Sequence, residues 1–330
     1  MQSTALLAFD IAAAEHEFVY EREGRCERGK VENTPSSLRQ FLQARLKAGP
    51  LRLVVEATGV YYLDAALIAA ELQIPVMVLN PKAAHHFAKV LMQRSKTDRQ
   101  DAQALLEYLR RMPFQPWQAP ARHLLEFRQF GRYLSQLSEE QTAAKNRLHA
   151  LESSEISPKL LRRDLHKAIA AMQLRIDRIT AEAMKLVGAN AELRTAFDAL
   201  DSIVGIAQTS ALMLLAEMVV LPRAMNSRAC ASHAGLDVRL HDSGSSVHKP
   251  ARISKHGNKY LRRALFMPSL SAVAHDPYAR AFRDRLVARG KKKMQAQVAV
   301  MRKMLTAAWA LFKNPGKYDA AKLYQLQPET

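Results

Sequence analysis

The chain has 330 residues, with 49 lysines and arginines against 31 aspartates and glutamates, a formal net charge of +18. A chain of this length has room for two or three domains, each with its own core, and so large an excess of positive charge favours an anionic polymer such as nucleic acid as a partner. A run of about 18 apolar residues, which a membrane helix needs, is missing, and the start MQSTALLAFD lacks the basic residues of a signal peptide.

The cysteines indicate a reducing cellular compartment and do not indicate a metal site or a disulfide. Cys26 and Cys230 are far apart and do not have the spacing of metal ligands. Two isolated cysteines are typical of a reducing environment in which no disulfide framework forms. We therefore expect a cytoplasmic protein that associates with nucleic acid and does not contact a membrane.

The N-terminal third alternates strand and helix patterns. Runs typical of strands are ALLAFDIA, EHEFVYE, RLVVEATG and IPVMVLN, and helical patterns lie between them in SSLRQFLQARLKAG, YYLDAALIAAELQ and PKAAHHFAKVLMQ. This alternation predicts an α/β layer built on a largely parallel sheet. The three prolines of MPFQPWQAP then close the domain, so we expect it to span residues 1–120.

Residues 121–190 have a purely helical pattern. Two seams in which steps of three and four alternate are separated by SSEISP; they are Leu134, Leu137, Gln141, Ala144, Leu148 and Leu151, then Leu165, Ile169, Met172, Ile176, Ile179, Ala183 and Leu186. Such spacing predicts a coiled-coil helical hairpin, packed on itself or on a second subunit. Two ordinary amphipathic helices of a bundle fit the same pattern equally well.

The remaining residues, 191–330, predict a third and mainly helical domain. LDSIVGIAQTSALMLLAEM has the shape of half a helix-hairpin-helix with Gly205 at its turn, and SGSSVHKPARISKHGNKYLRRAL reads as a polar loop that runs into a basic helix. The end of the chain is again helical, in KKKMQAQVAVMRKMLTAAWALF. The charges of this last helix are as well explained by a solvated face as by a binding surface.

Four carboxylates stand out from their surroundings. Asp10 is the only charge in ALLAFDIA and Glu56 the only acid in RLVVEATG. A lone carboxylate in a buried type of strand must be paired, neutralised or bound to a metal. Asp98 and Asp101 are one helical turn apart and continue the apolar rows of their helix, which places them at its buried edge. Helix capping alone would also account for acids in a first turn.

These acids predict a metal site. If the strands of Asp10 and Glu56 are neighbours in a parallel sheet, both acids lie at the carboxyl ends, where α/β sheets place their sites. Asp98 and Asp101 can reach the same edge from a helix. Four converging carboxylates need cations, and hard oxygen ligands suit Mg²⁺, of which two ions can clamp the attacking and leaving oxygens in phosphoryl transfer.

A basic element follows in the last region. Six cations lie close together at Lys249, Arg252, Lys255, Lys259, Arg262 and Arg263, and Gly257-Asn258 opens what looks like a helix. Amides at a helix N-terminus favour phosphate. Phosphate contacts position a nucleic acid without reading its sequence, so we expect these residues to bind nucleic acid and its sequence to be chosen elsewhere.

These motifs together resemble a known family. Asp10, Glu56 in EATG, and Asp98 and Asp101 in KTDRQDA look like the DEDD set of a family of bacterial insertion-sequence transposases, whose relatives include the pilin-gene-inverting recombinases. HAGLDVRLHDSGSSVHKPARISKHGNKYLRRAL is similar to the second signature of that family, with its serine-glycine pair and its K-x-G-N-x-x-L-R element. The resemblance spans almost the whole chain, in the right order and spacing.

The resemblance implies more than the spacing does. It implies an α/β RNase H-like (RuvC-like) catalytic domain over 1–120, a central coiled coil and a C-terminal transposase domain. It implies donor and target DNA and a noncoding bridge RNA as partners, in a homo-oligomer, dimer or tetramer. It also implies a serine nucleophile beside the four acids, which falls on Ser243 of the DSG triplet, with Ser245 and Ser246 close by. On its own, Ser243 beside Gly244 is typical of a turn.

Three functions are compatible with the sequence. The leading hypothesis is a transposase or site-specific recombinase that cuts and rejoins DNA. The second is a structure-specific endonuclease that uses the acids to hydrolyse DNA with water. The third is a non-catalytic nucleic-acid-binding protein whose acids are structural. A covalent protein–DNA adduct separates the first from the second, and dependence on Mg²⁺ separates both from the third.

Overall fold

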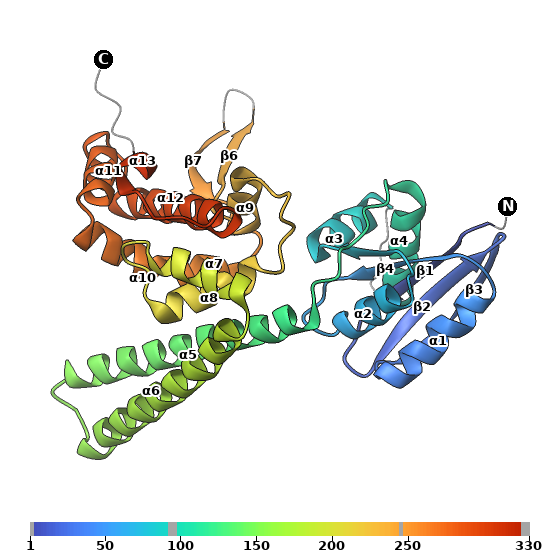
Figure 1. Cartoon of the computed structure of the whole chain (residues 1–330), viewed down its shortest axis with the longest axis horizontal. Coiled ribbons are helices and arrows are strands. Elements are labelled where there is room, and N and C mark those ends of the chain that lie inside the picture. Colours follow the sequence, from blue (N-terminus) through green and yellow to red (C-terminus); the bar gives the residue numbers. More distant parts are fainter. Residues whose placement is uncertain (1–2, 92–97, 244–246, 325–330) are drawn as a thin grey trace. The chain divides into compact units, whose positions relative to one another are not determined.

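The computed structural model of the chain describes residues 3–91, 98–243 and 247–324, without the side chains of residues 98–99 and 240–251. The chain divides into two compact units, Met1–Ala119 and Pro120–Thr330 (Figure 1). An α/β first region followed by a mostly helical remainder was predicted, and both are confirmed. None of the described helices combines the length and the apolar character needed to cross a membrane.

The first unit is built on a five-stranded sheet in the order β3-β2-β1-β4-β5. The strands are β1 (Ala5–Asp10), β2 (Glu15–Arg22), β3 (Arg25–Glu32), β4 (Leu51–Glu56) and β5 (Val76–Leu79). β4 runs parallel to both β1 and β5, whereas β2 is antiparallel to β1 and β3. The sheet is therefore mixed, and the expectation of a largely parallel sheet was wrong for its β3-β2-β1 half.

Helices cover both faces of this sheet. α1 (Pro35–Lys47) and α2 (Leu63–Glu71) pack on the face formed by odd-numbered residues of β1 and β4, such as Phe9 and Val55. α3 (Pro81–Val90) and α4 (Asp98–Arg111) pack on the opposite face, where Ala8 and Val54 meet the apolar stripe of α4. Alternation along a strand explains this division, because successive side chains point to opposite faces.

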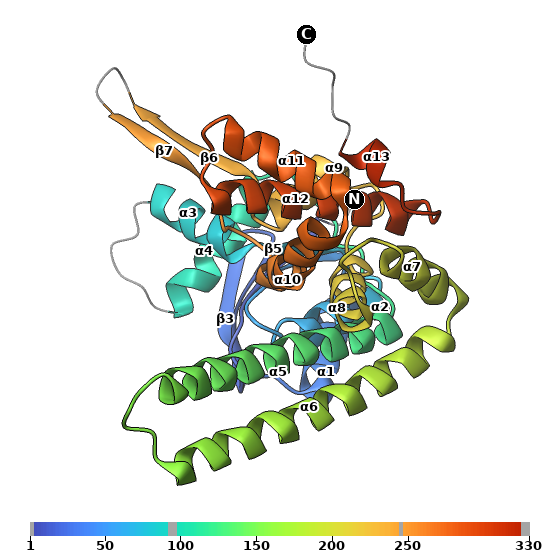
Figure 2. The same cartoon turned by 90° about the vertical axis from the view of Figure 1, so that its left-hand side faces the viewer.

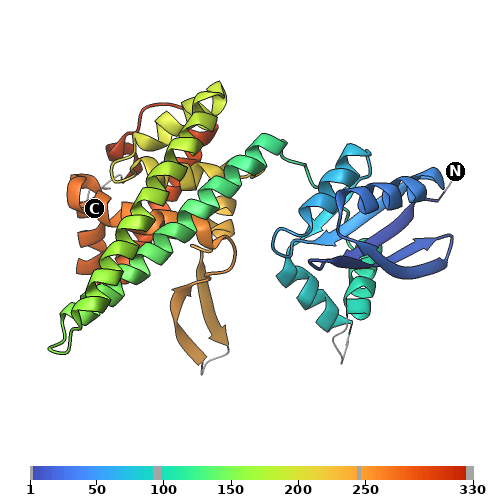
Figure 3. The same cartoon turned by 90° about the horizontal axis from the view of Figure 1, so that it is seen from below.

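The second unit begins with a helical hairpin. α5 (Arg122–Glu152) and α6 (Lys159–Gly188) lie side by side along their length (Figures 2 and 3). Leu134 and Leu137 of the first predicted seam are fully buried inside the chain itself. Gln141, the polar position of that seam, donates to Gln173 across the hairpin at 2.8 Å. The hairpin is thus present and packs on its own chain, while its coiled-coil geometry stays a prediction.

The rest of the second unit packs with the hairpin into one apolar core, which contains Trp309, Leu212 and Leu134. Its helices are α7 (Ala191–Asp201), α8 (Gln208–Met218), α9 (Ser227–His233), α10 (Lys259–His275), α11 (Pro277–Ala288), α12 (Lys293–Lys313) and α13 (Ala320–Leu323). Gly205 lies in the turn between α7 and α8, as predicted. Its φ is +95°, and a Cβ there would lie 2.4 Å from the carbonyl oxygen of Pro268, so only glycine fits.

A β-hairpin replaces the predicted polar loop. β6 (Val238–Ser243) pairs antiparallel with β7 (Val247–Ile253), with an irregularity between Arg239 and His241. The segment is polar and includes a proline, so its sequence lacks the apolar alternation from which strands are usually predicted. The pairing of the two strands rests on backbone hydrogen bonds, which do not require an apolar alternation.

Candidate functional site

Two predicted acids end neighbouring strands. The parallel register of β1 and β4 runs to the pair Phe9 and Val55, and Asp10 and Glu56 are the next residues on each strand. Adjacent strands are about 4.8 Å apart, so the two residues are neighbours at the carboxyl edge. Both are even-numbered like Ala8 and Val54, which places their side chains on the face covered by α4. Both are half-buried.

α4 is oriented so that its first turn comes to the same edge. Arg110, near the end of α4, forms an ion pair with Glu21 of β2. In the strand register, Glu21 lies opposite Leu6, near the start of β1. Gln103, two turns earlier, accepts a hydrogen bond from Arg28 of β3. Arg28 pairs with Val19 of β2, which pairs with Ala8 of β1, so Gln103 lies near the level of Ala8. The start of α4 therefore lies toward the level of Asp10. It carries Asp98, whose side chain lies outside the described residues, and Asp101, which is half-buried.

The loops at this edge are tied to one another. The Thr58 hydroxyl donates to Oε1 of Glu56 at 2.8 Å, which fixes one carboxylate oxygen of that acid. The amide of Asn33 donates to the carbonyl of Ala12, after β1, at 3.2 Å and to that of Tyr61, after β4, at 3.4 Å. Asn33 and Thr58 were not predicted as site residues. They position the acidic edge through backbone and carboxylate contacts.

A buried histidine lies beside this edge as well. Nδ1 of His16 accepts from the Ala12 amide at 3.4 Å, and its ring packs against Phe9 with centroids 5.7 Å apart. Burial lowers the pKa of His16, and interactions with the Asn33 side chain and the Ala12 backbone oppose this only in part. The imidazole is therefore neutral at physiological pH. It lies within β2 among apolar side chains, so its role is in packing and in holding the loop after β1.

The donor chemistry of the acidic edge fits Mg²⁺, which prefers carboxylate oxygens. Within the described residues, no group of three or more histidine, cysteine, aspartate or glutamate side chains is close enough to hold a metal. Asp10, Glu56 and Asp101 are among these residues and do not form such a group by themselves, and the side chain of Asp98 is not described. Its assignment to Asp10, Glu56, Asp98 and Asp101 remains a prediction, supported by the shared edge and face of Asp10 and Glu56.

The predicted basic element spans β7, the next turn and α10. Lys249 and Arg252 are on β7, and the side chain of Lys249 lies outside the described residues. Lys255 is exposed in the turn, with a φ of +52°. A Cβ on Gly257 would lie 2.2 Å from the carbonyl oxygen of His233, so this glycine lets the turn pass close to α9. Asn258 then caps α10 through the amides of Tyr260 and Leu261.

The three cations on α10 have different surroundings. Arg262 donates to the carbonyl of Ala234 at 2.7 Å, and burial lowers its pKa. Arg263 forms a 2.7 Å ion pair with Glu139 of α5. Lys259 is exposed, with its ammonium 5.4 Å from the Tyr260 ring centroid. Arg262 therefore fastens α10 to the end of α9, Arg263 fastens it to α5, and Lys259 is the cation that faces solvent.

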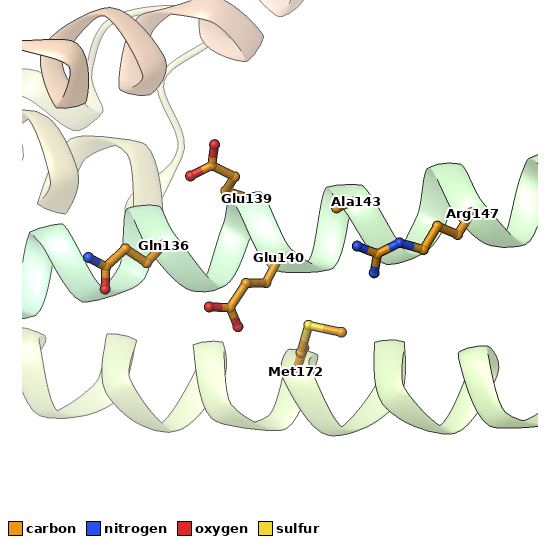
Figure 4. A pocket seen from close by; sticks show the side chains of 6 residues that line it. All are labelled: Gln136, Glu139, Glu140, Ala143, Arg147 and Met172. Carbon is orange, nitrogen blue, oxygen red and sulfur yellow. The ribbon is translucent and has the colours of Figure 1, made fainter.

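Glu139 also lines a shallow groove along the α5–α6 hairpin. Figure 4 shows its lining, in which Met172 of α6 faces the side chains of α5; the residues are Gln136, Glu139, Glu140, Ala143, Arg147 and Met172. The groove lacks a nucleophile and the metal-binding pattern of the acidic edge. We therefore assign no chemistry to it.

A second carboxylate site, which the sequence did not reveal, lies inside the second unit. Glu217 of α8 is 1% exposed. It accepts from Arg132 at 2.6 Å and from Arg128 at 3.1 Å, both on α5, and from Asn258 at 2.6 Å. Burial raises the pKa of Glu217, but the Arg132 hydrogen bond and the Arg128 and Arg132 charges outweigh it, so its pKa lies below the usual value. Glu217 ties α5, α8 and the cap of α10 together.

Ser243 is the last residue of β6, paired with Val247 of β7. Its side chain lies outside the described residues, and so do Ser245 and Ser246 altogether. The backbone places Ser243 at the end of a two-stranded ribbon, away from the helix-forming part of the motif. Its role as nucleophile remains a prediction.

Family models match two long parts of the chain. A model described as "Transposase" matches residues 7–152, and one described as "Transposase IS116/IS110/IS902 family" matches residues 198–284. The first match contains all four predicted acids. The second contains Ser243 and the six basic residues.

Curated proteins are similar over most of the length. The pilin gene-inverting protein of Moraxella bovis is 31% identical over 274 residues, which cover 82% of this chain and 82% of that protein. The protein of the same name from Moraxella lacunata matches equally. An uncharacterised 43.6 kDa protein of insertion element IS110 from Streptomyces coelicolor is 32% identical over 90 residues, 27% of this chain and 22% of that protein.

Proposed function

The chain belongs to the IS116/IS110/IS902 transposase family, and from this premise we propose that it cuts and rejoins DNA strands at the acidic edge of its first unit. The observation that carries the proposal is the placement of Asp10 and Glu56 as adjacent strand ends on the face covered by α4. The first turn of α4, with Asp98 and Asp101, comes to the same edge. DNA, as donor and as target, is the substrate.

The first unit is RNase H-like (RuvC-like) in this proposal. Three antiparallel strands followed by two parallel ones, with helices on both faces, support it. In such a sheet β1 and β4 are central neighbours, so acids at their ends are exposed to a substrate while the strands stay buried. The mixed sheet therefore agrees better with this fold than a largely parallel one would.

Mg²⁺ would be held by Asp10, Glu56, Asp98 and Asp101. When bound, it supplies positive charge to the phosphate oxygens and lowers the cost of deprotonating a hydroxyl nucleophile. Thr58 orients Glu56 for this task, because its hydroxyl occupies one carboxylate oxygen and leaves the other available. Asn33 keeps the loops after β1 and β4 in register with one another.

Ser243 supplies the nucleophile in this proposal. Its Oγ attacks the phosphorus and loses its proton, a phosphoserine ester forms, and the oxygen of the leaving strand departs as a hydroxyl after taking up a proton. The ester preserves the energy of the broken phosphodiester until the reverse attack by a new strand end rejoins the DNA. Water as nucleophile would discard that energy, which suits a nuclease but not strand exchange.

A noncoding bridge RNA would choose the sequence. The net charge of +18 favours extensive phosphate contact, and such contacts do not distinguish sequences. Base pairing by an RNA partner supplies what the cations do not. Lys249, Arg252, Lys255 and Lys259 are assigned to phosphate contact, whereas Arg262 and Arg263 support this surface through their bonds to Ala234 and Glu139. A homo-oligomer brings two DNA partners together.

The test is a covalent adduct between protein and DNA. The full chain, its RNA and a labelled donor DNA are mixed with Mg²⁺ and run on a denaturing gel. We expect an adduct with the parent protein and with Ser245→Ala and Ser246→Ala, none with Ser243→Ala, and none when EDTA removes the metal. Cleavage without any adduct would support the endonuclease, and binding that is indifferent to EDTA without cleavage would support a non-catalytic binder.

A further inference from the structure

An exposed tyrosine lies beside the acidic edge. In the turn after β4, Val60 and Tyr61 are 44% and 46% exposed, whereas the next residue, Tyr62, packs against the core under α1 and α2. The two tyrosines are adjacent in sequence and differ only in surroundings. The Tyr62 side chain anchors this turn to the core, whereas the Tyr61 ring faces solvent and is available to a ligand.

The turn holds this ring in a defined place. The Thr58 amide donates to the Glu56 carbonyl at 2.8 Å, and the Asn33 side chain donates to the Tyr61 carbonyl at 3.4 Å. Gly59 has a φ of +59°, which glycine adopts without strain. Two atoms of the Tyr61 ring lie 3.6 and 3.7 Å from where a Cβ on Gly59 would be. The ring therefore folds back over Gly59, three residues beyond Glu56.

The chemistry of the ring identifies the class of ligand. An exposed aromatic face next to a phosphoryl-transfer site is suited to a nucleobase, since every base has a π-face and stacking does not depend on sequence. A base inside a duplex is already stacked on its neighbours, so the ring favours an unpaired or splayed base. We propose that Tyr61 stacks on an unpaired base of the DNA strand next to the phosphate that is cut. This inference rests on the proposed function of the acidic edge.

The probe is a single-stranded DNA oligonucleotide that carries 2-aminopurine, whose fluorescence is quenched by stacking on an aromatic ring. We expect the full-length parent to quench it on binding. Tyr61→Ala should lose the quenching and bind about tenfold more weakly, the scale of one base–aromatic stack. Tyr61→Phe should keep both, because it keeps the ring. Met112→Ala is the matched control, since Met112 is 41% exposed in the same unit.

Several outcomes would overturn the stacking. Parent-like quenching and affinity in Tyr61→Ala would do so, and so would an equal loss in Tyr61→Phe, which would assign the effect to the hydroxyl. Circular dichroism and thermal melting check that the variants are folded. Tyr61→Leu keeps an apolar side chain in the turn but removes the ring, so it decides the question if Tyr61→Ala melts early; we expect it to behave like the alanine variant in binding.

Glu56→Gln separates this inference from the proposed function. It should abolish Mg²⁺-dependent cleavage and keep the quenching. If Glu56→Gln still cleaves while Tyr61→Ala loses the quenching, the proposed active site fails and the stacking stands. If Glu56→Gln loses cleavage while Tyr61→Ala quenches like the parent, the active site stands and the stacking is overturned.

Discussion

Two glutamates near the ends of a helix and a strand have the same carboxylate group but differ in burial and in hydrogen-bond partners. Glu217, near the end of α8, is 1% exposed and is held by Arg128, Arg132 and Asn258. Glu56, at the end of β4, is half-buried and accepts a hydrogen bond from Thr58. Among the described residues no ion pair involves Glu56, whereas Glu217 has two.

The difference shows how the surroundings of a carboxylate separate an acid that stabilises the fold from one that is proposed to bind a metal ion. A buried carboxylate is stable only when partners in the protein satisfy it, and Glu217 has them on three elements. Glu56 instead lies next to another acid, Asp10, at the carboxyl edge of the sheet, and in the proposed function bound cations neutralise the carboxylates of this edge. Removing the carboxylate should therefore have opposite consequences at the two places.

The largest effect is expected at the acidic edge. Asp10→Asn, Glu56→Gln and Asp101→Asn should each lower the rate of Mg²⁺-dependent strand cleavage on the order of a thousandfold or more, since they remove ligands of an ion that contributes several kcal/mol to the transition state. Glu56→Gln should keep a stability close to that of the parent, because its amide oxygen can still accept the hydrogen bond from Thr58. Cleavage is measured on labelled DNA and stability by urea unfolding.

Glu107→Gln is the control for these variants. Glu107 is on the same helix as Asp101 but pairs with Arg110 and Arg111 at the other end of it. It should cleave like the parent. If Glu56→Gln or Asp101→Asn cleaved like Glu107→Gln, the acids of the edge would be structural, as Glu217 is.

A smaller effect, on stability, is expected at the buried carboxylate. Glu217→Gln should lower the free energy of unfolding of the second unit by about 3 kcal/mol, because two arginines lose their counter-charge in a buried place. The chain contains two tryptophans, Trp117 in the first unit and Trp309 in the core of the second. In a Trp117→Phe background, the fluorescence of Trp309 reports the urea unfolding of the second unit.

Glu139→Gln provides the surface comparison. The side chain of Glu139 is 57% exposed in its ion pair with Arg263, and exposed pairs contribute less than about 1 kcal/mol. If Glu217→Gln destabilised the second unit no more than Glu139→Gln does, the network around Glu217 would not hold α5, α8 and α10 together.

Much of the acidic edge could be predicted from the sequence because its signal is local. Asp10 and Glu56 are single acids in short apolar runs. Because β1 and β4 are parallel neighbours, the carboxyl ends of the two strands lie side by side. β3 was missed because RCERGKVE is polar and most of it is exposed, so its place at the sheet edge depends on pairing with β2 rather than on its own pattern.

Glu217 had the same local signal and was still missed. It is the only charge in ALMLLAEM, as Asp10 is in ALLAFDIA. Its partners Arg128 and Arg132 lie more than eighty residues earlier, on a helix whose pairing with α8 has no sequence signature. A lone acid in an apolar run therefore predicts a carboxylate that needs a partner. Whether that partner is an arginine of the protein or a bound cation depends on the tertiary fold.

The smallest effect concerns pH and again separates the two places. The pKa of Glu217 is lower in the folded chain than its ordinary value of 4.5, so the folded state binds its proton less readily than the unfolded state does. Its contribution to stability is complete above that ordinary value and is lost as the pH falls below it. Burial likewise lowers the pKa of His233 below its ordinary value of 6.5, so its contribution is complete above pH 6.5 and is lost as the pH falls below it.

Stability of the second unit, followed through Trp309, should therefore fall in two stages on acidification, each with a slope of at most about 1.4 kcal/mol per pH unit for one proton. His233→Asn should remove the stage below 6.5. Glu217→Gln should remove the stage below 4.5 and enlarge the stage of His233, because the Glu217 charge raises the pKa of His233. Glu56→Gln should change neither, because Glu56 belongs to the other unit. A single stage that both second-unit variants leave in place would mean that other groups set the acid sensitivity, and that Glu217 titrates alike in the folded and unfolded chain.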